Sequence, residues 1–227
     1  MNRYKVIFFD LDNTLLDFYA SESRAIRQVL AKHGLPNGDA EAKLYSDINR
    51  SYWEAFERGD IKKEEIFAGR FRTFLERMGL NGDPEAIAKD YFGFLADGHD
   101  LMDGAVEILE WLRNNGCKVY ATTNGVALTQ YKRIKDSGLE PLFDGVFVSE
   151  TVGAQKPSKE YFEYVIQNTP TVDRDKILVV GDSQSSDILG GINAGLDTCW
   201  VAPKEQENKY NATFHISSLD ELKAIIL

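Results

Sequence analysis

The chain has 227 residues, of which 26 are Lys or Arg and 36 are Asp or Glu, so its formal charge is 26 − 36 = −10. Hydrophobic residues make up 43% and charged residues 27%, a composition typical of globular domains that excludes disordered and collagen-like chains. The acidic balance argues against binding to a nucleic-acid backbone, because such binding requires a basic face.

The cysteines and the start of the chain indicate a cytoplasmic protein. Cys117 and Cys199 lie in short apolar runs without a CxxC pair, so we expect two reduced thiols in a core. Only four apolar residues, 6–9, precede the first aspartate, and this run is too short for a signal peptide. No run approaches the ~18 apolar residues of a membrane span, so we expect no membrane partner.

The first element in chain order is a strand, and a helical insert follows it. Residues 4–9 are mostly β-branched or aromatic and predict a buried strand. Residues 17–99 have apolar side chains at helical spacing, and turn sequences at 34–38, 58–60 and 79–84 divide them into about four helices. An insert at this point lies over the carboxyl edge of a parallel sheet, where ligands bind, so we expect a cap that acts as a lid.

The rest of the chain alternates between strands and helices. The predicted strands are 118–122, 145–148, 177–180, 198–201 and, at the sheet edge, 213–216. The predicted helices are 105–115, 127–137, 159–168 and 186–194. This alternation predicts an α/β fold, a Rossmann-like parallel sheet with helices on both faces. We therefore predict a core domain from residues 1–16 and 100–227 and a helical cap domain from residues 17–99.

Two of the predicted strands end in aspartates. The first ends in Phe8-Phe9-Asp10-Leu11-Asp12, and the strand at 177–180 is followed by Asp182 and Asp187. Each pair is also compatible with a turn or a helix N-cap. However, buried carboxylates are costly unless something neutralises them. Oxygen ligands from Asp10 and Asp182 suit Mg²⁺, and an aspartate can be a nucleophile that forms an aspartyl-phosphate.

The other strand ends supply hydroxyl, amide and cationic groups. Thr123, Asn124 and Gly125 follow the second strand, and the glycine lets backbone approach a ligand closely. An Asn-Gly pair also suits a hairpin turn, but a helical run follows here. Lys156 lies in the loop after the third strand; its alternative is a solvated surface lysine. A cation and hydrogen-bond donors at this edge can hold the charge of a transferring phosphoryl group.

These four motifs, in this order, resemble those of the haloacid dehalogenase (HAD) superfamily, and the helical insert resembles its cap. The resemblance implies that Asp10 is the nucleophile and Asp12 the general acid/base. It implies that Thr123 and Asn124, with Gly125 beside them, hold the phosphoryl group, and that Lys156 bridges nucleophile and phosphate. It also implies a Mg²⁺ site, for which Mn²⁺ or Co²⁺ could substitute, formed by Asp10, the Asp12 carbonyl, Asp182 and, through water, Asp187.

Asp12 favours one branch of that superfamily. A phosphatase must protonate a leaving alkoxide, whereas a leaving halide needs no proton, and the dehalogenase branch lacks an aspartate at this position. We therefore predict a phosphomonoesterase. The alternatives are a sugar-phosphate phosphatase or phosphomutase, a 2-haloacid dehalogenase, and a non-catalytic protein that binds a phosphorylated ligand. The last would be expected to lack one of the core residues, and all are present.

A finer resemblance is to the pyrimidine 5′-nucleotidase subgroup. It rests on residues 181–196, which begin Gly181-Asp-Ser-Gln-Ser-Ser-Asp, on the Thr-Cys-Trp at 198–200, and on the cap segment from Trp53 to Phe71. It implies a nucleoside 5′-monophosphate as substrate. Trp53 and Arg70 are candidates for holding the base, although aromatic residues at helical spacing can equally be cap core. We expect a small phosphorylated metabolite as partner and a monomer or small homo-oligomer.

Overall fold

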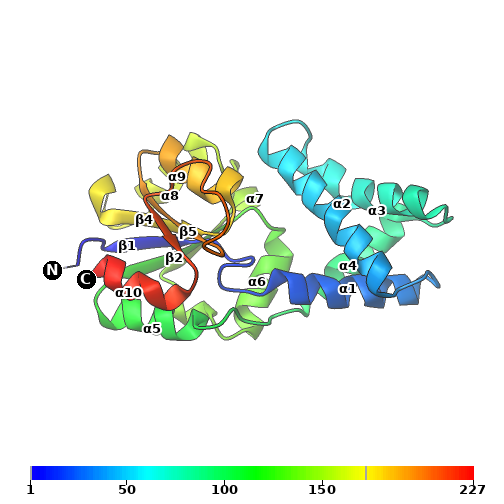
Figure 1. Ribbon diagram of the computed structural model, residues 1–227, viewed down its shortest axis with the longest axis horizontal. Coiled ribbons are helices and arrows are strands. Elements are labelled where there is room, and N and C mark those ends of the chain that lie inside the picture. The colour runs from blue at the N-terminus through cyan, green and yellow to red at the C-terminus, as the bar shows by residue number, and fades with distance from the viewer. Residues whose placement is uncertain (1, 172) are drawn as a thin grey trace. The chain divides into compact units, whose positions relative to one another are not determined.

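The structure is a computed structural model that describes residues 2–171 and 173–227. It divides into two compact units. One comprises Met1–Asp17 and Leu101–Leu227 and contains the sheet, and the other, Phe18–Asp100, is built from helices alone (Figure 1).

The first unit is built on a parallel six-stranded sheet with the order β3-β2-β1-β4-β5-β6. Its strands are β1 (Val6–Phe9), β2 (Lys118–Thr123), β3 (Gly145–Val148), β4 (Ile177–Gly181), β5 (Asp197–Val201) and β6 (Phe214–Ile216). Phe9, the last residue of β1, pairs with Ala121 on one side and Val180 on the other. The residues that follow these three strands therefore emerge side by side.

Helices cover both faces of this sheet. Successive side chains of a strand point to opposite faces, so Ile7 and Phe9 pack against α5 (Ala105–Asn114) and α10 (Leu222–Ile226). Val6 and Phe8 pack against α8 (Lys159–Gln167) on the other face. All four residues of β1 are buried, as expected for a central strand covered on both sides.

The remaining helices and helical turns complete the α/β unit. They are α6 (Ala127–Asp136), α7 (Ser149–Val152), α9 (Leu189–Asn193), the 3₁₀ turns η1 (Glu140–Leu142), η2 (Arg174–Lys176) and η4 (Leu219–Glu221), and the π-helical turn η3 (Gln184–Ile188). Cys117 and Cys199 are both buried and unbridged, as the sequence predicts.

The helical unit consists of α1 (Phe18–Lys32), α2 (Asp39–Glu57), α3 (Lys63–Met78) and α4 (Pro84–Ala96). Aromatic rings fill its centre: the Tyr45 ring centroid lies 5.0 Å from that of Phe71 and 5.3 Å from that of Tyr91. These side chains are fully buried, so the unit has an apolar core of its own. Among residues 2–171 and 173–227, no helix has the length and apolarity needed to cross a bilayer.

The predicted fold class is confirmed, and the differences are local. The first strand begins at Val6, two residues later than predicted. The predicted helix at 186–194 is instead the π turn η3 followed by α9. Helices α7 and α10 were not predicted, since four or five residues are too short to display helical periodicity.

Candidate active site

Three neighbouring strands deliver polar side chains to one edge of the sheet. β1 lies between β2 and β4, which the chain reaches in opposite directions along the sheet; open α/β sheets bind ligands at such a switch point. Asp10 directly follows β1, Thr123 ends β2, and Asp182 directly follows β4. The loop after α7 brings Lys156 to the same place.

Lys156 is the charged centre of this cluster. Its side chain is 1% exposed, and Nζ donates to Asp10 Oδ1 and Asp187 Oδ1, both at 2.6 Å, and to the Thr122 carbonyl at 2.9 Å. Burial opposes a charge on this lysine, but the carboxylates of Asp10 and Asp187 outweigh it and raise its pKa. The lysine is therefore a fixed cation, as expected for a bridge between a nucleophile and a phosphate.

The acidic side chains exceed the positive charge available to them. Carboxylate oxygens of Asp10, Asp182 and Asp187 lie within 4.8 Å of one another. With all three ionised and Lys156 charged, the cluster has a formal charge of −3 + 1 = −2. Burial, then repulsion from Asp187 and Asp12, raises the pKa of Asp10 to about 8 although Lys156 opposes the shift. Burial and repulsion from Asp10 and Asp187 also raise the pKa of Asp182. A divalent cation with oxygen ligands, such as Mg²⁺, fits this donor set and its excess charge.

A π turn directs Asp187 back toward the end of β4. Oδ2 accepts from the Ser183 N–H at 3.1 Å, and Oδ1 accepts from Lys156. The carboxylate lies so close to Gly181 that a Cβ there would meet Oδ2 at 2.2 Å and Cγ at 2.3 Å. Both carboxylate oxygens already have protein donors, an arrangement that favours indirect support of a cation over direct ligation.

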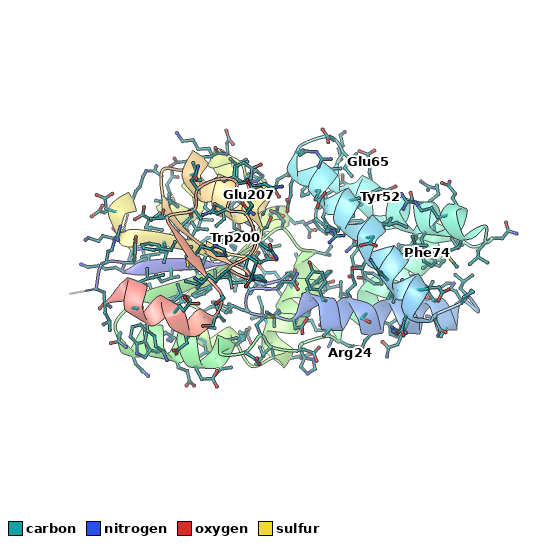
Figure 2. All side chains as sticks on the ribbon, in the orientation of Figure 1. Arg24, Tyr52, Glu65, Phe74, Trp200 and Glu207 are labelled. Carbon is teal, nitrogen blue, oxygen red and sulfur yellow. The ribbon has the colours of Figure 1, made fainter. Side chains whose placement is uncertain are left out.

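Asp182 is positioned through its backbone. The indole of Trp200 on β5, labelled in Figure 2, donates to the Asp182 carbonyl at 2.8 Å. Trp200 is 1% exposed, and its ring stacks on His215 with centroids 4.4 Å apart. A rigid buried donor thus fixes the residue at the end of β4.

Asp12 is partly exposed and held at both carboxylate oxygens. Gln130 Nε2 donates to Oδ2 at 2.9 Å, and Arg133 donates to Oδ1. The next residue, Asn13, has φ +58°, a left-handed conformation that asparagine tolerates better than most residues. The turn returns the chain to Leu16, whose carbonyl accepts the Asn13 N–H at 2.7 Å.

Thr123, Asn124 and Gly125 lie together at the end of β2, where the sequence predicts a phosphoryl-binding turn. The Asn124 amide forms two hydrogen bonds of 2.9 Å with the backbone of Lys156, donating to its carbonyl and accepting its N–H. This side chain therefore positions the Lys156 loop, a role that the sequence did not reveal. Thr123 Oγ1 accepts from Gly125 N at 3.0 Å and from Gln130 Nε2 at 2.9 Å.

The two cap candidates differ in exposure. Trp53 on α2 is partly exposed, and its ring meets that of Phe56 edge-on with centroids 5.8 Å apart. Arg70 on α3 is 1% exposed, donates to Asn49 Oδ1 at 2.6 Å, and lies 4.8 Å from the Tyr91 ring centroid. Arg70 is thus part of the interior of the helical unit, whereas Trp53 offers part of its surface to solvent.

Two residues around the site, Gln130 and Arg133, were not identified from the sequence. Two others, Gly181 and Trp200, were noted only within the segments that resemble the pyrimidine 5′-nucleotidase subgroup, and no role was assigned to them. The sequence offers only a weak signal for the first two: their three-residue spacing places them on one face of a helix. That this face is buried, so that the polar pair needs partners, is known only from the fold. The roles of Gly181 and Trp200 could not be inferred from those segments, because their contacts depend on where the π turn and β5 lie.

Comparisons with known proteins agree with this geometry. A family model described as haloacid dehalogenase-like hydrolase matches residues 4–195. The HAD-hydrolase YfnB of Bacillus subtilis is 41% identical over 228 residues, which are 100% of this chain and 97% of YfnB. The pyrimidine 5′-nucleotidase PynA of Streptococcus pneumoniae is 36% identical over 96% of this chain and 93% of its own. The pyrimidine 5′-nucleotidase YjjG of Escherichia coli is 34% identical over 97% and 96%.

Solved structures of similar fold include a hydrolase of this kind and a dehalogenase. The crystal structure of YfnB bound to magnesium superposes with a TM-score of 0.92 and covers 98% of each chain at 41% identity. An L-2-haloacid dehalogenase of Xanthobacter autotrophicus also covers 98% of each chain, with a TM-score of 0.76 and 17% identity. At that identity the likeness concerns the fold alone.

Proposed function

Because the chain belongs to the haloacid dehalogenase-like hydrolase family, we propose that it is a Mg²⁺-dependent phosphomonoesterase whose nucleophile is Asp10. Phosphatases of this family stand among its relatives. The observation that carries the proposal is the arrangement at the end of β1: Asp10 is paired with a buried lysine, and a second carboxylate, Asp12, is held two residues away.

In the first step a carboxylate oxygen of Asp10 attacks phosphorus. A P–O bond to Asp10 forms, the bond between phosphorus and the ester oxygen breaks, and Asp12 gives its proton to the leaving oxygen. Lys156 is 2.6 Å from Asp10 and supplies a fixed positive charge beside the transferring phosphoryl group. The Thr123 hydroxyl and the Asn124 backbone N–H would donate to the phosphoryl oxygens, because the Gly125 N–H already donates to Thr123 Oγ1.

In the second step Asp12 takes a proton from water. The water oxygen attacks phosphorus, the bond to Asp10 breaks, and inorganic phosphate leaves with the Asp10 carboxylate restored. A haloalkanoate would need no proton donor for its leaving group, so the presence of Asp12 favours the phosphatase reaction over dehalogenation.

Asp10 and Asp182 would hold the metal with the Asp12 backbone carbonyl, and Asp187 would support it. This set supplies the hard oxygen ligands that Mg²⁺ prefers. When bound, Mg²⁺ offsets negative charge on the phosphoryl group and the nucleophile. Mn²⁺ or Co²⁺ could substitute.

A nucleoside 5′-monophosphate, with a pyrimidine preference, is the substrate we propose. Two relatives at 36% and 34% identity are pyrimidine 5′-nucleotidases. The core chemistry is common to all monoesters, so the helical unit, acting as a cap, would read the leaving group; Trp53 is its partly exposed aromatic candidate. Small sugar phosphates are the second candidate, because glyceraldehyde 3-phosphate phosphatase of Pyrococcus furiosus is 28% identical over 100% of this chain.

Phosphate release measured across nucleotides, sugar phosphates and an aryl phosphate tests this function. We expect pyrimidine monophosphates to give the highest kcat/KM, and Asp10→Asn to lose turnover on every substrate. Near wild-type turnover by Asp10→Asn would refute the mechanism. A preference for triose phosphates would refute the nucleotide assignment alone.

A further inference from the structure

Asp12 is held by two side chains that the proposed reaction does not use. Gln130 and Arg133 lie three residues apart on α6 and are 1% and 0% exposed. Gln130 contacts Oδ2 of Asp12 and Arg133 contacts Oδ1. Buried polar side chains on a short helix are fixed by packing, so the carboxylate they hold has a defined direction.

The amide of Gln130 has one chemically consistent orientation. Its Oε1 accepts from Arg133 at 3.0 Å, and its Nε2 donates to Asp12 Oδ2 and Thr123 Oγ1, both at 2.9 Å. A reversed amide would set an oxygen against the Asp12 carboxylate and an NH₂ group against the guanidinium. The contacts on both sides therefore determine which end of the amide faces Asp12.

Gln130 also directs the proton of the Thr123 hydroxyl. Thr123 Oγ1 accepts from Gln130 Nε2 and from the Gly125 N–H at 3.0 Å. Both partners are N–H groups that can only donate. The hydroxyl oxygen is thus occupied as an acceptor, and its own proton is available to donate away from α6.

Gly125 leaves the space that Gln130 fills. A Cβ at position 125 would meet Gln130 Nε2 at 2.6 Å and its Cδ and Cγ at 2.7 Å. A side chain at this position would displace the amide from both Asp12 and Thr123. The glycine is therefore required by the positioning amide as well as by any approaching ligand.

The geometry points to Gln130 and Arg133 as positioning residues: Arg133 orients the Asp12 carboxylate, and Gln130 orients both the Asp12 carboxylate and the Thr123 hydroxyl. This assignment rests on the proposed function, in which Asp12 is the acid/base and Thr123 donates to the phosphoryl group. Substitutions of the two residues should therefore affect different steps of the reaction. Loss of Arg133 affects mainly proton transfer, because Arg133 contacts Asp12 directly and reaches Thr123 only through the Gln130 amide. Loss of Gln130 also affects phosphoryl binding directly, because Gln130 contacts Thr123 itself.

Two aryl phosphates separate these effects. Phenyl phosphate has a basic leaving group that needs a proton, while 2,4-dinitrophenyl phosphate does not. Displacement of a catalytic group by about 1 Å can cost about 100-fold. We expect Arg133→Lys and Arg133→Met to lower kcat for phenyl phosphate by roughly 10- to 100-fold, with KM changed less than about three-fold. Their single-turnover burst of dinitrophenolate should stay within about three-fold of wild type.

Gln130→Glu preserves volume but replaces the donor with an acceptor. The new carboxylate would repel Asp12 and draw the Thr123 proton toward α6, so both the phenyl phosphate turnover and the dinitrophenolate burst should fall roughly 10-fold or more. Lys135→Met is the matched control, because it removes a positive charge from an exposed position of the same helix. It should change neither readout.

Circular dichroism of each variant checks folding; should Arg133→Met unfold, the comparison is made with Arg133→Lys and Gln130→Glu. Equal losses on both substrates for the Arg133 variants, or no loss on either, would overturn the assignment. An absent dinitrophenolate burst in the wild-type protein would instead count against the proposed function, so the two failures are distinguishable.

Discussion

Gly181→Ala is a single methyl group added where the site has no space for it. The new Cβ would lie 2.2 Å from Asp187 Oδ2, whereas ordinary van der Waals contact begins at 3.4 Å. The carboxylate must therefore move by about 1 Å, the difference between these distances. Its hydrogen bond from Lys156, now 2.6 Å, would lengthen beyond the usual range of about 3.2 Å.

The expected cost follows from that lost contact. A hydrogen bond to a charged group contributes about 1.5–3 kcal/mol, which for a chain of this size lowers the melting temperature by about 3–12 °C. Displacing a group that supports a metal ligand typically weakens metal binding by about 10–100-fold. Thermal unfolding in chelator measures the first effect, and Mg²⁺ titration calorimetry measures the second.

A double-mutant cycle shows whether the clash is the cause. Asp187→Gly removes the three atoms nearest to the new Cβ, which are Oδ2, Cγ and Cβ of Asp187, so Gly181→Ala should cost less than about 0.5 kcal/mol in that background. Gly93→Ala is the control, because position 93 lies in a helix with no atom within 4 Å of an added Cβ; it should be neutral or stabilising by up to about 1 kcal/mol. The same cost for Gly181→Ala in both backgrounds would refute the reasoning.

Activity should vanish with chelator and return with Mg²⁺, and full activity in excess chelator would contradict the metal site. Without metal, the pKa of Asp10 in the folded protein is about 8, against an ordinary value of 3.8. Its contribution to stability is therefore fully present below about pH 4 and is lost as the pH rises toward 8. Melting temperatures measured in chelator should fall across this pH range, and Asp10→Asn should make the fall smaller. Trp53→Ala should lower kcat/KM for thymidine or uridine monophosphate by roughly 5- to 100-fold and spare phenyl phosphate; equal losses on both would make Trp53 cap core.

Strand ends were the most predictable part of this molecule. Parallel strands bring their carboxyl ends to one edge, so Asp10, Lys156 and Asp182 could be grouped from their positions after three predicted strands. The family resemblance drawn from these motifs is confirmed by the family match and the relatives. The parallel α/β fold is confirmed as well.

Side chains that act through other side chains were not predictable in the same way. A helical wheel treats polar residues as exposed, but Gln130 and Arg133 are buried because Asp12 lies opposite them in the folded chain. Position 181 must be a glycine because the π turn places the Asp187 carboxylate against it, and no local sequence pattern predicts that turn. Arg70 illustrates the converse, since its polarity suggested a ligand contact while aromatic rings surround it inside the helical unit.

The measurement that bears most directly on the mechanism is the trapping of a phosphoenzyme. Asp12→Asn, incubated with Mg²⁺ and 2,4-dinitrophenyl phosphate and quenched in acid, keeps the nucleophile but lacks the base that would release the phosphoryl group. Tandem mass spectrometry should find the phosphoryl group on Asp10, and the double variant with Asp10→Asn should carry none. A phosphoryl group on any other residue, or an unlabelled Asp10 in a variant that turns over, would contradict the mechanism.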